Sequence, residues 1–371
     1  MISRRIFLGG LTAVATSASA GNTPIKGAVN RAVEAFLAAS PQSVGLSLGI
    51  FLSGRMSRFN YGHMAPGKKT APTSKTLYPI ASITKTFTGT LLAMAQLEGR
   101  LRLDDDIRQY LDGDYPNLAF DGHSIRLCDL VDHRSGLPLM LPDRPETRPD
   151  FAGGGSFTAR ITDIWKTYTR ADFYADLHRV TLSAIPGQNF QYSNAAAMLA
   201  GYILERLYDQ PYETLVKTKI TMPLGMNDTT ITLSPSQARR TVKGYDATGM
   251  VTPDNPDAIQ AAGALRSTID DMLKYVAWQV AESNSAVTLS HKSCTGAGAY
   301  QAGLMLNDKG RRVIWQSGNI EGFHSFCVAE PELKLGLVAL FNEADEKSNQ
   351  GHNTLVNVIL KSVASEAVLL P

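Results

Sequence analysis

The chain has 371 residues, of which 44% are hydrophobic and 19% are charged, so it can bury a large core in two domains or one elaborate domain. Its 36 basic and 34 acidic side chains leave a formal charge of +2 without a dense run of Lys or Arg in the body of the sequence, so we expect no nucleic-acid partner. Cys128, Cys294 and Cys327 form neither a disulfide framework nor a metal-binding spacing, so we expect buried free thiols.

The first 20 residues have the features of a secretory signal peptide. Two arginines precede an apolar stretch at residues 6–15, and small residues at 18–20 provide a cleavage site. Residues 3–8 (SRRIFL) also fit the twin-arginine export pattern. The apolar stretch is shorter than the roughly 20 residues that a spanning helix needs. We therefore expect a periplasmic or secreted protein with no transmembrane segment in the mature chain.

The predicted elements begin with a helix and a hairpin. Apolar residues at helical spacing predict a helix over residues 26–39. Alternation over residues 44–52 and 56–61, with a Ser-Gly turn between them, predicts a β-hairpin. Residues 83–98 are rich in Leu, Ala and Met and end before a glycine, which predicts a helix with a glycine cap.

The middle of the chain, residues 103–249, is predicted to be an inserted helical domain, with a long surface loop at the Pro- and Gly-rich residues 140–158. Strands are predicted in the tail over residues 303–306, 313–317, 324–330 and 335–342, followed by a helix over 353–367. Because strands occur at both ends of the chain, residues 21–102 and 250–371 are expected to share one sheet.

Ser82 and Lys85 stand at the start of the predicted 83–98 helix. Residues three apart share a helical face, so the Lys85 amine can reach the Ser82 hydroxyl. The helix N-terminus favours negative charge nearby, and a partly desolvated lysine can take the proton of an attacking serine. The same string is also typical of a helix cap followed by a solvated lysine.

Tyr192 and Asn194 form a second candidate pair, because a helical run at residues 195–207 follows them directly. Tyr192 would share a proton with the serine and the lysine, and the Asn194 amide would orient the lysine and the acyl group of the substrate. A rival Tyr-Pro-Asn string at residues 115–117 has the character of a turn.

A third candidate is the strand end formed by Gln316, Ser317, Gly318 and Asn319. Small residues there would let a substrate approach the backbone, and a backbone amide would be a second oxyanion donor beside that of Ser82. Taken alone, the segment is also typical of an ordinary edge strand and hairpin.

In this order, the three candidates resemble the serine beta-lactamase and penicillin-binding protein superfamily in its class C (AmpC-like) branch. Residues 235–240 (PSQARR) and the long loop before residue 186 resemble the AmpH-type D-alanyl-D-alanine carboxypeptidase/endopeptidases. The other segments that carry the resemblance are residues 99–106 (GRLRLDDD), 133–138 (HRSGLP), 223–230 (PLGMNDTT) and 262–268 (AGALRST).

The resemblance implies an α/β (α+β) fold in which helices flank an antiparallel sheet, with an inserted all-helical domain and the site between the two parts. It implies that a D-Ala-D-Ala peptide of peptidoglycan, or a beta-lactam, acylates Ser82 and is then hydrolysed by water without a metal or cofactor. The Ser82 and Asn319 backbone amides would form the oxyanion hole. Whether Lys85 or the Tyr192 phenolate takes the proton is left open.

Gln316 departs from the family pattern, in which a Lys or His usually begins this motif and helps to hold a substrate carboxylate. Losing one charge-assisted contact typically costs about 1.5–3 kcal/mol. Carboxylate binding should therefore be poorer unless His324, Arg311 or Arg312 substitutes. A carboxylesterase of the same superfamily, or a non-catalytic peptidoglycan-binding relative, thus remains an alternative.

A competing pattern is the GLSLG string at residues 45–49, which matches the nucleophile elbow of the α/β-hydrolases, with His133, His291 or His324 as partners. The elbow has to turn from a strand into a helix. Because these residues lie inside a predicted alternating strand, we disfavour a Ser-His-Asp triad.

Overall fold

The computed structural model describes residues 23–39, 45–65, 70–148, 150–151, 160–161, 164–245, 259–294, 298–320 and 322–367. The predicted signal peptide, the predicted domain boundary at residues 249 and 250, and most of the second half of the predicted 140–158 loop lie outside the described residues.

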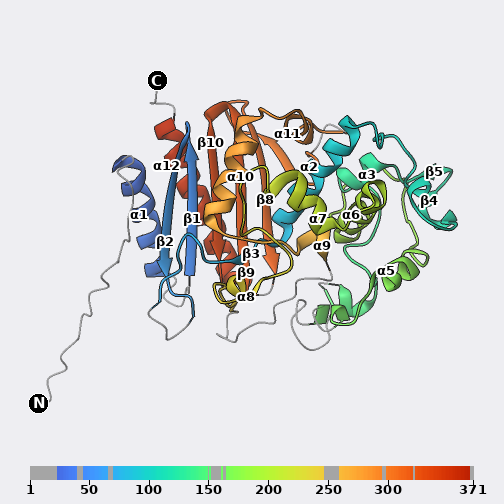
Figure 1. The fold of residues 1–371 in the computed structure, drawn as a ribbon, viewed down its shortest axis with the longest axis horizontal. Coiled ribbons are helices and arrows are strands. Elements are labelled where there is room, and N and C mark those ends of the chain that lie inside the picture. Colours follow the sequence, from blue (N-terminus) through green and yellow to red (C-terminus); the bar gives the residue numbers. More distant parts are fainter. Residues whose placement is uncertain are drawn as a thin grey trace, which may run out of the picture.

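A six-stranded antiparallel sheet, with strand order β2-β1-β10-β9-β8-β7, forms the centre of the larger part of the molecule (Figure 1). Strand β1 pairs with β10, so strands from the N-terminal and C-terminal parts of the described chain share one sheet. The strands are β1 (Gly45–Leu52), β2 (Arg55–Gly62), β7 (Gly303–Leu306), β8 (Arg312–Ile320), β9 (Phe323–Glu330) and β10 (Leu335–Phe341).

The predicted hairpin is present, and its turn has a clear local cause. Ser53 and Gly54 both have positive φ angles, 48° and 86°, which is the twist that two-residue hairpin turns require. The predicted tail strands are also present, but β8 continues past its predicted end at Ser317 to Ile320. Gly318 and Asn319 are therefore strand residues, because both pair with β9.

Helices cover both faces of this sheet (Figure 1). Helix α10 packs on one face, where Gly49 and Gly336 leave room: a Cβ atom at either glycine would lie 2.8 Å from Leu273 or Val276 of the helix. Helices α1 and α12 pack on the opposite face, against alternate strand residues such as Leu48. The helices described in this half of the molecule include α1 (Thr23–Ala39), α2 (Thr84–Leu97), α10 (Ile269–Ala281), α11 (Ser285–Ser290) and α12 (Glu346–Ala367).

The predicted inserted region is mainly helical where it is described, with one short hairpin. Isolated β-bridges connect the last part of this region to the sheet-containing half. They pair Thr230 with Arg266, Thr241 with Leu77, and Tyr245 with Glu343. Its elements and the short segments that join the two halves are β3 (Tyr78–Pro79), β4 (Ala119–Phe120), β5 (His123–Ser124), α3 (Leu127–Val131), α5 (Arg170–Leu177), α6 (Asn194–Tyr208), α7 (Tyr212–Val216), α8 (Pro235–Ala238), α9 (Gln260–Gly263) and β6 (Arg266–Ser267).

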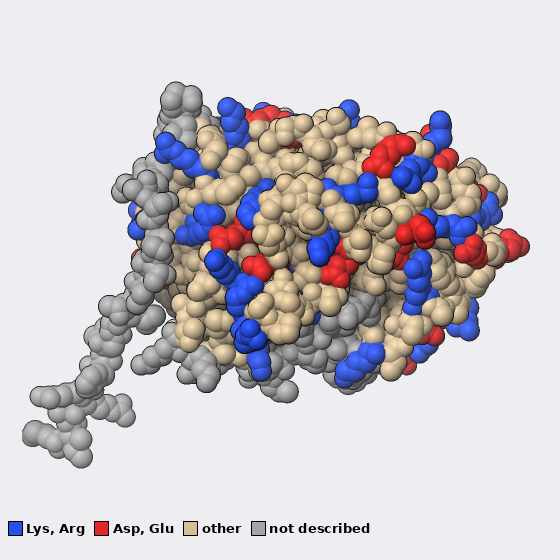
Figure 2. Space-filling view, in the orientation of Figure 1, with Lys and Arg blue, Asp and Glu red and all other residues tan. Residues whose placement is uncertain are grey.

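On the face shown in Figure 2, Lys and Arg side chains lie interspersed with Asp and Glu side chains. None of the helices in the described ranges is both long and apolar enough to span a bilayer. The three cysteines are free thiols, and Cys128 and Cys327 are buried as expected, whereas Cys294 is only half-buried.

Candidate active site

Ser82 lies in a sharp turn that joins strand β3 to helix α2. The residue before it, Ala81, has a φ of 44°, a left-handed conformation that costs free energy for a residue other than glycine. Two hydrogen bonds of Ile80 hold the turn in place. The Ile80 N–H donates to the Leu265 carbonyl at 2.9 Å, and the Ile80 carbonyl accepts from the Ser325 hydroxyl at 2.9 Å. Ser82 is in the 3₁₀ turn η1 (Ala81–Ile83), so the α-helix begins just after the predicted position.

Lys85 is fully buried one turn further along the chain, and three oxygen atoms surround its amine. The Lys85 nitrogen lies 3.1 Å from the Ser82 hydroxyl, 2.7 Å from the Asn194 side-chain oxygen and 2.6 Å from the Ala262 carbonyl. Burial lowers the pKa of Lys85 below its ordinary value, while the neighbouring Tyr192 phenol acts in the opposite direction.

These three contacts suit both protonation states of the lysine. The Asn194 and Ala262 oxygens lack hydrogens, so each takes one N–H from the amine. The Ser82 hydroxyl can accept the third N–H of an ammonium or donate its own proton to the lone pair of a neutral amine. A proton can therefore pass between serine and lysine without rearrangement of the other two contacts.

Tyr192, in the loop before α6, and Asn194, at the start of α6, reach this cluster. Asn194 is the first residue of α6, and the Ser193 hydroxyl caps the helix by accepting the Ala196 N–H at 2.9 Å. The Lys85 nitrogen lies 5.0 Å from the centroid of the Tyr192 ring. The structure thus brings together all four residues of the first two candidates, although they come from two distant segments.

Strand β8 approaches the nucleophile turn at Gly318. A Cβ atom there would lie 2.4 Å from the Ile80 carbonyl oxygen and 2.9 Å from the Ala81 Cβ, so only glycine allows this approach. The neighbouring strand β7 pairs with β8 only as far as Trp315, because Gly303, the first residue of β7, pairs with Trp315. Among the described strands, only β9 pairs with β8 beyond that point.

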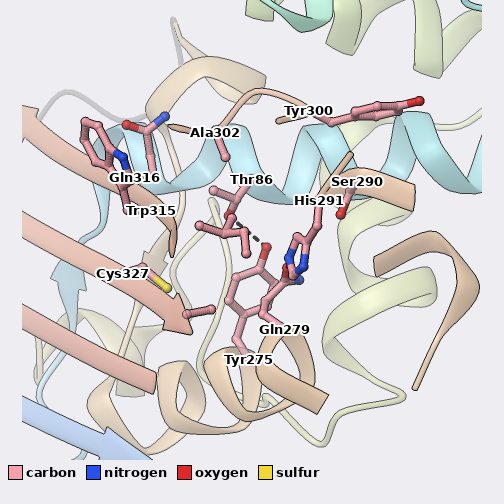
Figure 3. Close-up of a pocket in the computed structure, with 12 residues that line it drawn as sticks. Thr86, Tyr275, Gln279, Ser290, His291, Tyr300, Ala302, Trp315, Gln316 and Cys327 are labelled. Carbon is pink, nitrogen blue, oxygen red and sulfur yellow. Dashed lines mark hydrogen bonds between the residues drawn. The ribbon is translucent and has the colours of Figure 1, made fainter. Parts of the chain in front are cut away.

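Gln316 turns into the protein interior. Its amide donates to the Gln301 carbonyl at 3.2 Å, and its side-chain oxygen accepts the Ser317 N–H at 3.0 Å. Figure 3 shows Gln316 at the edge of a small cavity that Thr86 and Tyr275 also line. The volume is about 20 Å³, close to what one water molecule needs. The side chain at this motif position is therefore neutral and already hydrogen-bonded.

None of the three proposed substitutes supplies a positive charge in its place. Burial lowers the pKa of His324 to about 4, and its ring packs beside Phe326. Both Arg312 terminal nitrogens contact Glu282 at 2.8 Å. Arg311 lies just before β8 and precedes Gln316 by five residues, or roughly 16 Å along an extended chain.

The competing sequence patterns have structural roles. Ser47 is fully buried inside β1, where its hydroxyl donates to the Asn60 side chain at 2.8 Å and bonds the Tyr78 hydroxyl at 3.0 Å. In the rival string, Tyr115 stacks on a histidine ring, and Asn117 donates to two backbone carbonyls. Neither arrangement provides an activated nucleophile.

Sequence reasoning did not find the Ala262 carbonyl or the position of His133. Both lie in segments that carry the family resemblance, but a backbone carbonyl has no side-chain signature. His133 is buried, and its ring centroid lies 4.5 Å from that of Tyr192.

A family model described as beta-lactamase matches residues 29–361. The chain belongs to the beta-lactamase family. The match spans both halves of the fold and includes every residue of the three candidates.

Curated relatives align with this chain over only part of their own length. Protein flp of Staphylococcus aureus (strain MRSA252) is 27% identical over 301 residues, which cover 76% of this chain and 56% of flp. The D-alanyl-D-alanine-carboxypeptidase/endopeptidase AmpH of Escherichia coli (strain K12) is 31% identical over 235 residues, which cover 63% of this chain and 57% of AmpH. The chain therefore spans little more than half the length of these relatives.

Solved structures share the fold over most of the chain. The beta-lactamase/D-alanine carboxypeptidase from Yersinia pestis complexed with citrate has a TM-score of 0.74 and 24% identity, covering 91% of this chain and 98% of its own. The corresponding protein from Pseudomonas syringae has a TM-score of 0.75 and 19% identity, with the same coverage. These matches confirm the predicted α/β fold with an antiparallel sheet.

Proposed function

We propose that this beta-lactamase family member is a serine hydrolase that forms an acyl-enzyme at Ser82. The observation that carries the proposal is the buried Lys85 amine, 3.1 Å from the Ser82 hydroxyl and held by two carbonyl oxygens. We propose a D-Ala-D-Ala peptide of peptidoglycan, or a beta-lactam, as the acyl donor. The family match and the name of the AmpH relative support this substrate class.

In the acylation step, the neutral Lys85 amine takes the Ser82 proton as the serine oxygen bonds to the substrate carbonyl carbon. The carbonyl oxygen becomes an oxyanion, which the Ser82 and Asn319 backbone amides stabilise. When the intermediate collapses, the carbon–nitrogen bond of the substrate breaks. The proton then passes from Lys85, with Tyr192 beside it, to the leaving nitrogen.

In the second step, water adds to the acyl carbon, the bond to the Ser82 oxygen breaks, and the serine recovers its proton. The lowered pKa of Lys85 favours the neutral amine that the first step needs. We favour Lys85 over Tyr192 as the base, because Lys85 has the direct contact with the serine hydroxyl.

A carboxylesterase is a second candidate, and Gln316 is the observation that favours it. An uncharged ester needs no cation at this position, whereas the carboxylate of a peptide or beta-lactam gains from one. A non-catalytic peptidoglycan-binding relative would keep the same fold but would not form an acyl-enzyme.

Intact-mass analysis after incubation with penicillin and with purified muropeptides tests the proposal. We expect a mass increase of one penicillin on the wild type and none on Ser82→Ala. Hydrolysis of muropeptides would identify the peptidase. Turnover of a p-nitrophenyl ester alone would identify the esterase. No adduct and no turnover with any of the three substrates would reject a hydrolase and leave the binding relative.

Export to the periplasm or the medium is part of the proposal, with the twin-arginine route as a prediction from residues 3–8. Fractionation of cells that express the full chain tests it. We expect the mature protein outside the cytoplasm and its precursor retained when both arginines are replaced by lysine.

A further inference from the structure

His133 holds the backbone on both sides of Tyr192. The His133 carbonyl accepts the Gln191 N–H at 2.7 Å, and its ring Nδ1 accepts the Ser193 N–H at 3.3 Å. One residue thus binds the amide before the tyrosine and the amide after it. Such a pair of contacts restricts both the position and the rotation of the intervening residue.

The histidine ring also packs against the phenol itself. The ring centroids of His133 and Tyr192 lie 4.5 Å apart with a 35° tilt, and the Phe190 ring meets the histidine edge-on at 6.1 Å. His133 is only 5% exposed. The tyrosine therefore has a rigid support on the side of its ring that His133 contacts.

The hydrogen bonding of the His133 ring indicates that this residue does more than stabilise the fold. Because Nδ1 accepts an N–H, a neutral ring carries its proton on Nε2. Nε2 is buried and has no hydrogen-bond partner among the described residues. Burial, with a smaller effect of Lys85, lowers the pKa of His133 to about 3, so the ring stays neutral near pH 7. An unmet buried donor destabilises the fold, so stability alone does not account for the residue.

We propose that His133 is a positioning residue that sets the Tyr192 phenol against the Lys85 amine through its Nδ1 contact and its ring. This inference rests on the proposed acyl-enzyme chemistry. Among the described residues, no hydrogen bond joins His133 to Ser82, so His133 acts through the tyrosine and is not itself a general base.

Two substitutions separate the parts of this role. His133→Phe keeps a ring but removes the acceptor for the Ser193 N–H. His133→Asn keeps an acceptor near the Nδ1 position, and asparagine tolerates the φ of 55° found here. We expect the acylation rate constant to fall about 10- to 100-fold in H133F with little change in substrate affinity, and H133N to recover most of that loss. His324→Phe is the matched control, because it replaces another buried histidine that has no contact with Tyr192.

A double-mutant cycle with Tyr192→Phe gives the decisive reading. If His133 acts by placing the phenol oxygen, H133F should slow acylation at least 10-fold in the wild-type background but less than 2-fold in the Y192F background. His133→Gly, which accepts the positive φ without strain, replaces H133F in the cycle if H133F does not fold.

Three results would overturn the inference: wild-type acylation in folded H133F, equal losses in both tyrosine backgrounds, or a loss in H324F that matches H133F. Absence of acylation in the wild type would instead reject the proposed function, so the two failures are distinguishable.

Discussion

The Lys85 nitrogen lies 3.1 Å from the Ser82 hydroxyl, and its two other contacts are carbonyl oxygens from distant segments. A buried ammonium or amine is tolerated only where such partners satisfy its hydrogens. The Asn194 and Ala262 oxygens do this while leaving the third contact for the nucleophile. The arrangement thus favours proton transfer over simple ion solvation.

Replacing Lys85 by methionine should abolish most acylation. The methionine keeps the length of the side chain but cannot accept the serine proton, so we expect the acylation rate to fall about 10²- to 10⁴-fold. Stopped-flow labelling with a fluorescent penicillin or an activated ester measures this. Lys75→Met, at an exposed lysine, is the control and should label at the wild-type rate. Rapid labelling of folded K85M would point to Tyr192 as the base.

Replacing Gly318 by alanine should separate β8 from the nucleophile turn. The added Cβ would lie 2.4 Å from the Ile80 carbonyl oxygen, so the strand has to shift. We expect at least a 10-fold slower acylation and a loss of about 1–3 kcal/mol of stability, the usual cost of overpacking. Gly27→Ala, within helix α1, is the control and should leave both unchanged or raise stability slightly. An unaltered acylation rate in G318A would mean that β8 does not contribute to the site.

Replacing Gln316 by lysine should raise the preference for substrates that bear a carboxylate. A charge-assisted contact is worth about 1.5–3 kcal/mol, so kcat/KM for such a substrate should rise about 10-fold relative to a neutral ester. Gln316→Met is the control, because it changes the side chain without adding charge. Comparison of the two kcat/KM ratios checks the prediction, and an unchanged ratio in Q316K removes our account of this position.

Acid should weaken the fold through the buried pair His324 and His352, whose Nδ1 atoms lie 3.3 Å apart. Burial lowers the pKa of His324 to about 4, and burial with the neighbouring charge lowers the pKa of His352 to about 3. Since the unfolded chain binds these protons near pH 6.5, their stabilising contribution is complete above that pH and is lost as pH falls toward 4 and 3.

Melting temperatures between pH 4.5 and pH 8 measure this dependence. We expect His352→Phe to make the decline below pH 6.5 shallower by about one proton, or about 1.4 kcal/mol per pH unit. The decline should persist in part, because His133 is also buried with a lowered pKa. His123→Phe, at an exposed histidine, should keep the wild-type slope. Equal slopes in H352F and wild type would exclude the pair as the cause.

Much of the fold could be predicted where its causes are local. The Ser-Gly turn requires positive φ at both residues, so the first hairpin follows from its sequence. Helix α10 was not predicted, although Thr268 caps it and accepts the Asp271 N–H at 3.2 Å.

The order of the residues places Ser82 and Lys85 on one face, because a spacing of three residues sets that contact within one helical turn. It also determined the alternating strands and the neutral residue at Gln316. Three features depend on long-range packing: the Ala262 carbonyl completes the lysine site, Gln316 turns toward Gln301, and His133 supports Tyr192. These contacts join residues far apart in the chain, and side-chain spacing has no information about which backbone carbonyl a folded chain places beside a buried amine.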